Sequence, residues 1–227
     1  MSEDRDWTGN SVSVFSNLGA SNHSEGERQC HDFYATHPSA IDGLLEKETL
    51  PETIWEPACG SGCLSKRLEQ SGHKVISTDL YDQGYGTSGV DFLRTGKMPD
   101  GCKCILTNPP FRYAMEFAMH GLDILPDGGI MFLFLRLQFL EGKQRYDGIY
   151  RNNPPRSVHV FSSRMTCAMN ADFQNMSGSA QSYAWYVWDK GYRGDTAVDW
   201  LKTSIRRTGK TIRANSAKSD GEPLLFN

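Results

Sequence analysis

The chain has 227 residues, of which 38% are hydrophobic and 22% charged, and its formal net charge is −3. This composition fits a globular protein with one ample core and at most a small second unit, and the net negative charge argues weakly against a nucleic-acid partner. No run of roughly eighteen or more apolar residues occurs, so we expect no membrane-spanning helix.

The N-terminal sequence and the cysteines indicate the compartment in which the protein is expected. The N-terminal sequence MSEDRDWTGN is acidic and polar, unlike a signal peptide. The cysteines show no paired CxxC spacing, so no zinc or other metal site is expected. They are Cys30, Cys59, Cys63, Cys102, Cys104 and Cys167. Free thiols suit a reducing compartment, and the expected location is cytoplasmic.

The charges are unevenly distributed along the chain. Residues 1–135 contain 10 Lys and Arg against 19 Asp and Glu, whereas residues 136–227 contain 14 against 8. A basic half beside an acidic half is compatible with a phosphate-facing surface. A solvated face that happens to be basic is the alternative.

The polar ends bound a folded domain. Residues 1–30 are rich in Ser, Asn, Gly and Glu and are expected to form a mobile arm. Residues 31–202 are expected to form the domain, with target-contact loops inserted at about 138–156 and 163–178. A helix is expected to begin near Trp200, and residues 203–227 form a basic tail that we expect to be disordered.

A glycine-containing turn joins the first strand of the domain to the helix that follows it. Ahead of this strand, Pro38 favours the start of an earlier helix. Residues 53–56 then form the strand, which is short and apolar. The turn that follows, through Gly60 and Gly62, lets a ligand approach the backbone closely. Neither the dinucleotide fingerprint nor the P-loop pattern is present. Glu56 would sit poorly beside a pyrophosphate and well beside a cationic or amine-bearing ligand.

A second strand over residues 73–79 ends in an acid. Asp79 lies 19 residues after Gly60, the distance at which an acid binds ribose hydroxyls in Rossmann-like units. The alternative is an aspartate that caps the next segment. Residues 90–93 form a third short element, which also carries an acid, Asp91.

The strand over residues 104–106 leads into the turn Asn108-Pro109-Pro110-Phe111. Two prolines cannot continue a strand, because they lack the N–H and fix φ. The Asn108 amide oxygen and the Pro109 carbonyl are neighbouring acceptors, which suit a substrate –NH2 group. Phe111 offers a ring on which a heteroaromatic base can stack. An ordinary strand-ending turn is the alternative.

The remaining elements indicate a mostly parallel sheet with helices on both faces. Residues 114–125 are helical in pattern, and residues 130–137 form a strand apolar enough to be covered on both faces. Residues 158–161 and 183–188 form two more strands. They are joined without room for a crossover helix, so we expect them to be antiparallel.

Three motifs together resemble the amino-methyltransferases. Residues 55–62 (WEPACGSG) are similar to the S-adenosylmethionine motif of this class, and Asn108-Pro109-Pro110-Phe111 is similar to its catalytic motif. Their order, with residues 32–38 ahead of them, resembles the γ arrangement of DNA adenine N6-methyltransferases. Residues 13–23 with 32–38 resemble the small phage and prophage members. The resemblance implies a Rossmann-like, mostly parallel seven-stranded sheet with an antiparallel last strand.

The resemblance also implies the cofactor, S-adenosyl-L-methionine, and a site for it. The implied cofactor residues are Tyr34, Thr36, Pro38, Glu56, Pro57, Ala58, Gly60, Gly62, Asp79, Leu80, Asp91, Phe92 and Asn108. Asn108, Pro109, Pro110 and Phe111 would hold the target amine. The family's common residue at position 108 is Asp. Asn supplies the same oxygen acceptor but cannot act as a base, which keeps N4-cytosine in DNA or a non-DNA amide open as the target. Methylation of an RNA adenine or a protein glutamine, which uses similar Asn-Pro-Pro-aromatic chemistry, is a further alternative, and a non-catalytic binding module that kept the fold is another.

The implied partner is double-stranded DNA with the target base flipped out, at a cost of a few kcal/mol. The candidate phosphate contacts are Lys143, Arg145, Arg151 and Arg164. Such contacts are blind to sequence. No separate recognition domain fits into the chain, which predicts a short or relaxed target sequence or the help of a second subunit in a homodimer.

Overall fold

The computed structural model describes residues 35–163, 165, 167–168 and 181–202. The expected N-terminal arm and basic tail lie outside them, as do two predicted site residues, Tyr34 and Arg164. No helix in this part of the chain is long and apolar enough to cross a membrane.

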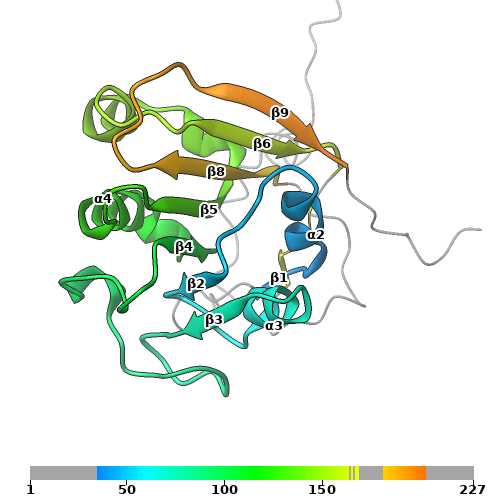
Figure 1. Cartoon of the computed structure of the whole chain (residues 1–227). Helices are drawn as coiled ribbons and strands as arrows, with labels where there is room; N and C mark the ends of the chain where they lie inside the picture. Colours follow the sequence, from blue (N-terminus) through cyan, green and yellow to red (C-terminus); the bar gives the residue numbers. More distant parts are fainter. Residues whose placement is uncertain (1–34, 164, 166, 169–180, 203–227) are drawn as a thin grey trace, which may run out of the picture.

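A seven-stranded sheet forms the centre of the molecule (Figure 1). Its strands, in spatial order, are β3 (Lys74–Ser77), β2 (Thr53–Glu56), β4 (Cys104–Thr107), β5 (Ile130–Arg136), β8 (Tyr183–Asp189), β6 (Ser157–Phe161) and β9 (Ala197–Leu201). β8 is antiparallel to both of its neighbours, and the other pairs are parallel. The predicted Rossmann-like sheet is therefore confirmed, and so is the antiparallel pairing of residues 158–161 with 183–188.

Helices cover both faces of this sheet (Figure 1). α2 (Ser39–Leu45) and α3 (Cys63–Gln70) lie on one face, and α4 (Ala114–Ile124) lies on the other. The short elements are η2 (Phe92–Arg94), η3 (Phe111–Tyr113), η4 (Leu137–Leu140), α5 (Lys143–Arg145) and η5 (Tyr146–Tyr150). A separate two-stranded sheet pairs β1 (Ala35–Thr36) with β7 (Cys167–Ala168).

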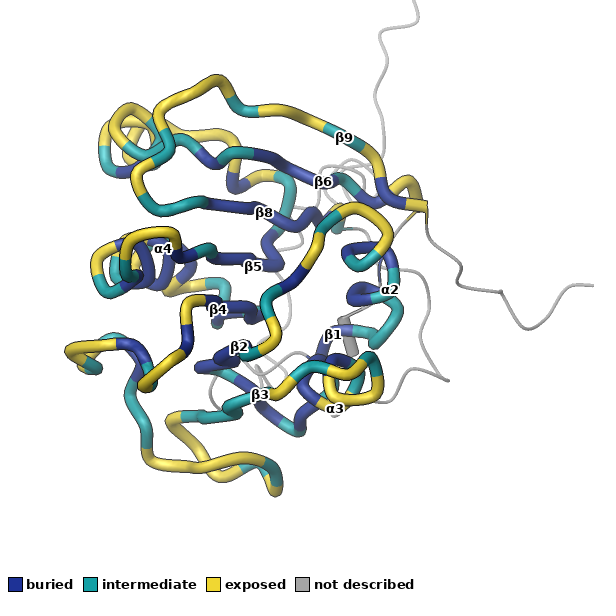
Figure 2. The backbone as a smooth tube through the Cα atoms, viewed as in Figure 1, coloured by how far each residue is buried: buried dark blue, intermediate teal, exposed yellow. Residues whose placement is uncertain are grey.

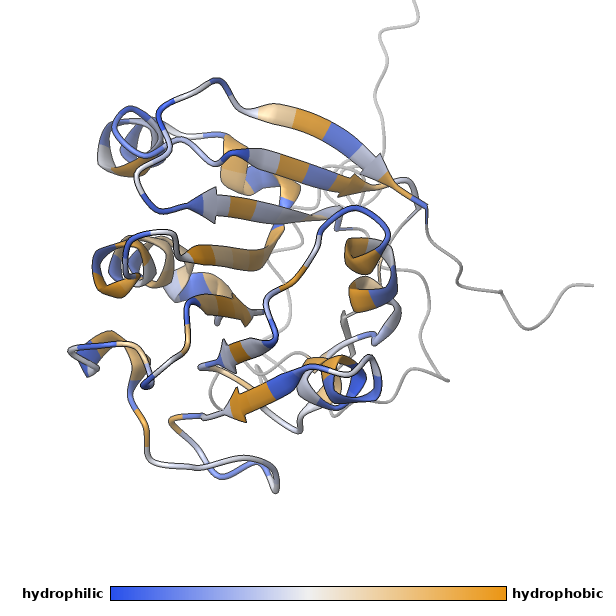
Figure 3. Ribbon diagram, in the orientation of Figure 1, coloured by the Kyte–Doolittle hydropathy of each residue, from blue (hydrophilic) through white to orange (hydrophobic). Residues whose placement is uncertain are grey.

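Alternation along β5 divides the core into two layers. Met131 and Leu133 pack with α4, whereas Phe132 and Phe134 pack on the side of α2 and α3. Because successive side chains of a strand point to opposite faces, a strand covered on both sides must be apolar throughout. The central strands are accordingly buried in Figure 2 and hydrophobic in Figure 3.

The order of the strands leaves a crevice beside β2. β2 pairs in parallel with β3 on one side and with β4 on the other. The chain therefore passes from β2 to β3 in one direction along the sheet and then returns past β2 to reach β4. At such a switch point the loops at the carboxyl ends of the strands diverge, and ligands of open α/β sheets bind there.

One sequence expectation is wrong, and another is now assigned to a type of element. The helix expected near Trp200 is wrong, because residues 197–201 form β9, which pairs with β6 and covers its otherwise open edge. The mix of Val198, Trp200 and Leu201 has no period that separates a helix from a strand, so pairing with β6 decides the outcome. The element expected over residues 90–93 is the short helix η2, capped by the Asp91 carboxylate, which accepts a hydrogen bond from the Leu93 amide.

Candidate active site

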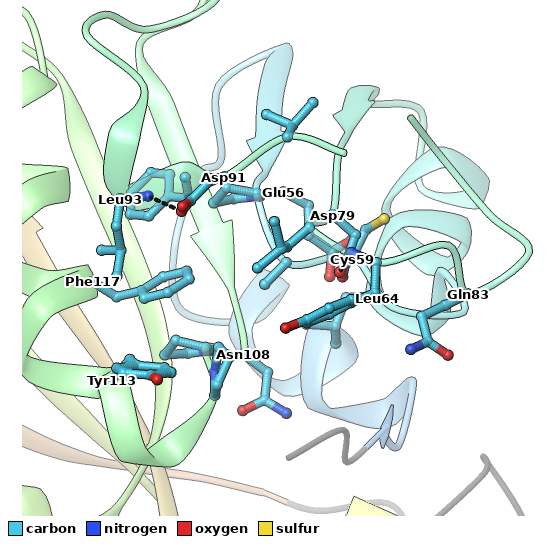
Figure 4. Close-up of a pocket in the computed structure, with 18 of the residues that line it drawn as sticks. Glu56, Cys59, Leu64, Asp79, Gln83, Asp91, Leu93, Asn108, Tyr113 and Phe117 are labelled. Atoms are coloured by element: carbon cyan, nitrogen blue, oxygen red, sulfur yellow. Dashed lines mark hydrogen bonds between the residues drawn. The ribbon is translucent and has the colours of Figure 1, made fainter. Parts of the chain in front are cut away.

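A cavity of about 560 Å³ opens at the carboxyl ends of β2, β3 and β4 (Figure 4). It lies at the switch point of the sheet. The residues that line it are Ala35, Thr36, Glu56, Pro57, Ala58, Cys59, Ser61, Cys63, Leu64, Asp79, Leu80, Tyr81, Gln83, Val90, Asp91, Phe92, Leu93, Arg94, Asn108, Pro109, Pro110, Phe111, Arg112, Tyr113 and Phe117. One cavity thus joins the glycine turn, the acid that follows β3 and the turn that follows β4.

The glycine turn is fixed by its own conformation and by Asp79. Gly62 has φ 78°, a left-handed value that glycine adopts without strain. The Gly60 amide donates a hydrogen bond of 2.8 Å to one oxygen of the Asp79 carboxylate, and the Tyr81 amide donates one of 2.9 Å to the other. Asp79 therefore ties the first two strand ends together and still faces the cavity, each oxygen with a lone pair to spare.

Glu56 lies deep in the cavity and is only 2% exposed. Burial raises its pKa to about 8; hydrogen bonding from Ser65 opposes this shift, and the charges of Asp79 and Glu69 add to it. The Ser65 hydroxyl donates to the Glu56 carboxyl group. With Asp79 and Asp91 also lining the cavity, its acidic wall suits a cationic ligand.

Cys59 does not act as a nucleophile in this environment. Its side chain is buried, and burial raises the pKa of its thiol to about 12, with the charges of Glu56 and Asp79 adding to the shift. Because the thiolate is the reactive form, such a thiol is inert near neutral pH.

Asn108 reaches the cavity from the side opposite these acids (Figure 4). β4 ends at Thr107, and the prolines that follow turn the chain into η3. The ring of Phe111 also lines the cavity, and its centroid is 5.8 Å from that of Tyr183. The guanidinium of Arg136 lies over the Phe111 ring, 4.5 Å from the ring centroid.

Thr36, the second residue of β1, lines another wall of the cavity. The residue is 2% exposed and lines the cavity, and its hydroxyl oxygen has no hydrogen-bond partner within the described residues. A buried hydroxyl without a partner is unfavourable by about 1–3 kcal/mol. This hydroxyl is therefore suited to a hydrogen bond with a ligand that fills the cavity.

The cavity gathers most, but not all, of the predicted site residues. Thr36, Glu56, Pro57, Ala58, Asp79, Leu80, Asp91, Phe92, Asn108, Pro109, Pro110 and Phe111 line it. Gly60 and Gly62 shape the turn without lining the cavity, and Pro38 directly precedes α2 outside it. Phe92 is only 3% exposed, since its ring packs against Trp55 at 5.3 Å and Phe117 at 4.7 Å. Phe92 therefore contributes an edge rather than an open face.

Several lining residues lie outside the sequence motifs. They include Cys63, Leu64, Tyr81, Gln83, Arg112, Tyr113 and Phe117. Tyr81 and Gln83 belong to the loop after Asp79, and Arg112 and Tyr113 come directly after Phe111. Their one signal in the sequence is their position just beyond a strand that ends in a motif.

Of the predicted phosphate contacts, the structure describes Lys143, Arg145 and Arg151, and none of these three lines the cavity. Lys143 and Arg145 follow the carboxyl end of β5; Lys143 is paired with Asp147, and an Arg145 guanidinium nitrogen lies 3.3 Å from the carbonyl of Gln138. Arg151 lies two residues before Asn153, whose carbonyl accepts a hydrogen bond from Trp188. Trp188 pairs with the start of β5, so Arg151 lies toward the amino end of this strand and not toward its carboxyl end.

Within the described residues, no group of three or more His, Cys, Asp or Glu side chains is arranged to hold a metal ion. The acidic residues of the cavity, Glu56 at the end of β2 and Asp79 and Asp91 on later segments, are engaged separately with backbone amides or hydroxyl groups.

Comparison with other proteins identifies the fold. No family model matches the sequence, and no curated protein matches it by sequence similarity. A structure from Listeria monocytogenes, named as a candidate class I S-adenosylmethionine-dependent methyltransferase, is 14% identical with a TM-score of 0.50, covering 85% of this chain and 71% of that one.

Two further solved structures agree with it. A modification subunit of a candidate type I restriction enzyme from Vibrio vulnificus is 14% identical with a TM-score of 0.50, covering 88% of this chain and 51% of that one. A candidate RNA methyltransferase from Pyrococcus horikoshii is 13% identical with a TM-score of 0.50, covering 77% and 95%. The chain thus has the Rossmann-like fold of the class I S-adenosylmethionine-dependent methyltransferases.

Proposed function

We propose that the protein transfers a methyl group from S-adenosyl-L-methionine to the exocyclic N6 of an adenine flipped out of DNA. The observation that carries this proposal is that the Asn-Pro-Pro-Phe turn and the glycine turn line one cavity at the switch point of the sheet. When bound, the cofactor supplies an activated methyl group on a sulfonium. Because this donor is already activated, the protein's task is to position the two reactants.

The residues on the β2 and β3 side fit this cofactor. Asp79 presents carboxylate oxygens suited to ribose hydroxyls, at the strand end where Rossmann-like folds bind them. The acid Glu56 would hold the cationic methionine portion, and the Thr36 hydroxyl gains the partner that it otherwise lacks. Leu80, which is 45% exposed at the edge of the cavity, offers apolar surface to the adenine ring.

The residues on the β4 side fit an amino group bound to an aromatic ring. The Asn108 amide oxygen and the Pro109 carbonyl would each accept one hydrogen of the target –NH2. Held in this way, the nitrogen lone pair turns out of conjugation and toward the methyl carbon. The nitrogen would then bond to that carbon as the carbon–sulfur bond breaks, and the surplus proton would leave for water.

The choice of DNA rests on the resemblance of the motifs and on the fold shared with a restriction-modification subunit. That neighbour has a TM-score of 0.50, as does the candidate RNA methyltransferase, so the fold does not rank DNA above RNA. Stacking of the flipped base beside Phe111 would return about 1–3 kcal/mol of the cost of extrusion. Lys143 and Arg145 are the described candidates for phosphate contact at this edge.

The test is radiolabelled methyl transfer to DNA, RNA and protein in parallel, with the wild type and two Asn→Ala variants. Asn108→Ala should keep the unfolding temperature and lose about 100-fold or more of the transfer rate, by analogy with the loss of one preorganised polar contact. Asn152→Ala, an exposed side chain outside the cavity, is the matched control and should act like the wild type.

The products of this assay separate the proposed target from its alternatives. Digestion of the methylated DNA distinguishes N6-methyladenine from N4-methylcytosine. Transfer to RNA or to protein glutamine, with none to DNA, would replace the proposed substrate, and transfer by Asn108→Ala at the wild-type rate would remove the proposed mechanism.

A further inference from the structure

Arg136 places a positive charge against the aromatic ring of Phe111, the last residue of the Asn-Pro-Pro-Phe turn. It is the last residue of β5, and β5 runs parallel to β4 with Leu133 opposite Thr107. Arg136 therefore stands beyond the point where β4 ends and the turn begins. Its guanidinium lies 4.5 Å from the centroid of the Phe111 ring, which lines the cavity.

This guanidinium lacks the hydrogen-bond or ion-pair partners of three other half-buried arginines; even Arg145, whose Nε is likewise buried and unpartnered, donates to the Gln138 carbonyl through a terminal nitrogen. Arg67 is paired with Asp42, and Arg156 is paired with both Glu48 and Asp189. Within the part of the chain that the structure describes, the Arg136 guanidinium forms no ion pair and no hydrogen bond, and its Nε is buried without a partner.

Such a cation is costly to keep unless it has a ligand. A guanidinium partly removed from water loses hydration, and the electrons of an aromatic ring compensate for only part of that loss. Phe111 contacts the group from one side, and a guanidinium carries five N–H donors in a rigid fork, more than one ring can engage. The donors of Arg136 are therefore available to an anion that arrives with the substrate.

We propose that Arg136 binds the phosphodiester group beside the target nucleotide. This inference rests on the proposed function and narrows it, because a base held near Phe111 brings its own phosphate to the same edge of the sheet. A planar guanidinium matches a phosphate with two parallel hydrogen bonds. A neutral glutamine side chain has no anion to offer, so Arg136 makes the site selective for nucleic acid over protein amides.

The test is a cycle that changes the arginine and the phosphate separately. Methyl transfer is measured for the wild type and Arg136→Gln, on a short oligonucleotide and on one with a neutral methylphosphonate in place of the phosphate next to the target base. Either change alone should lower kcat/KM about 10- to 100-fold, as for the loss of a charged hydrogen bond, and the two together should lower it no further. Arg136→Gln should also reduce the slope of binding against salt by about one.

Control measurements keep the outcomes distinct. Arg193→Gln, an exposed arginine at the opposite edge near Asn153, should keep the wild-type salt slope and transfer rate. Arg136→Gln should keep the affinity for the cofactor. Arg136→Lys retains the charge and should keep the sensitivity to methylphosphonate, whereas Arg136→Met, which also removes the charge, replaces Arg136→Gln in the cycle if that variant unfolds.

Three results would overturn different conclusions. Additive effects of the arginine and phosphate changes in an active enzyme mean that Arg136 does not bind this phosphate, and they end this inference alone. Equal loss on a peptide substrate with an acidic neighbour would mean that the group binds carboxylates. If the wild type transfers no methyl group to any nucleic acid, it is the proposed function that fails.

Discussion

Glu56→Gln should change how the stability of the protein depends on pH. Burial raises the pKa of Glu56 to about 8, whereas a glutamate in the unfolded chain titrates near 4.5. Between these pH values the folded protein holds a proton that the unfolded chain has lost. The stability that this proton contributes is fully present below pH 4.5 and is lost as the pH rises through 8. The difference corresponds to roughly 5 kcal/mol.

Glutamine keeps the shape of the protonated acid and cannot ionise. Urea unfolding from pH 5 to pH 9 should therefore show similar stabilities near pH 5 and a growing advantage of Glu56→Gln at higher pH, up to about 5 kcal/mol. Glu52→Gln, the same substitution at an exposed position just before β2, should keep the wild-type profile. Parallel pH profiles for the wild type and Glu56→Gln would refute the buried, protonated carboxyl group.

The same carboxyl group should couple cofactor binding to proton release. A cationic ligand beside Glu56 favours its charged form and lowers its pKa. At pH 7 the wild type should release close to one proton when S-adenosylmethionine binds, and Glu56→Gln should release none. Calorimetry in two buffers with different ionisation enthalpies measures the number; equal release by both proteins would contradict a contact between Glu56 and the cofactor.

Three further predictions concern two residues of this site and one residue outside it. Gly62→Ala should destabilise the protein by about 2–4 kcal/mol in urea unfolding, because φ is 78° and the added Cβ would lie 2.3 Å from a ring carbon. Asp79→Asn should weaken cofactor binding about 10- to 100-fold by calorimetry without unfolding the protein. Burial acts to raise the pKa of Glu48, but hydrogen bonds and charges from His159 and Arg156 outweigh it and lower the value to about 2. The stability that Glu48 contributes is thus present above pH 4.5 and lost toward pH 2, and Glu48→Gln should flatten the unfolding temperature over that range.

The sheet was predictable because its strands carry strong local signals. The run through Phe132 and Phe134 in β5 is apolar at every position, which only a strand covered on both faces requires. β9 carries no such signal. Val198 and Trp200 are 51% and 61% exposed, and the strand exists because the edge of β6 is there to pair with it. An edge strand of this kind depends on the finished sheet, not on its own residues.

The site was predictable where motif residues follow strands, and hidden where it depends on packing. Parallel strands bring Glu56, Asp79 and Asn108 to one edge whatever the register, so their proximity follows from the order of the elements. The contact between Arg136 and the Phe111 ring is different, since it requires β5 to extend past the end of β4. No local pattern carries that offset.

The presence of Asn at position 108 bears on how the target amine loses its proton. An amide accepts a hydrogen bond but does not take up a proton at neutral pH. The carboxyl groups of the cavity belong to the other side: Asp79 is held by two backbone amides, Asp91 caps η2, and Glu56 already carries a proton below pH 8. In the proposed reaction the nitrogen would therefore attack with both hydrogens in place, and the cationic product, a far stronger acid than the amine, would give its proton to water afterwards. Such a site would gain its rate from holding the amine in line, a role for which Asn108 supplies the oxygen acceptor.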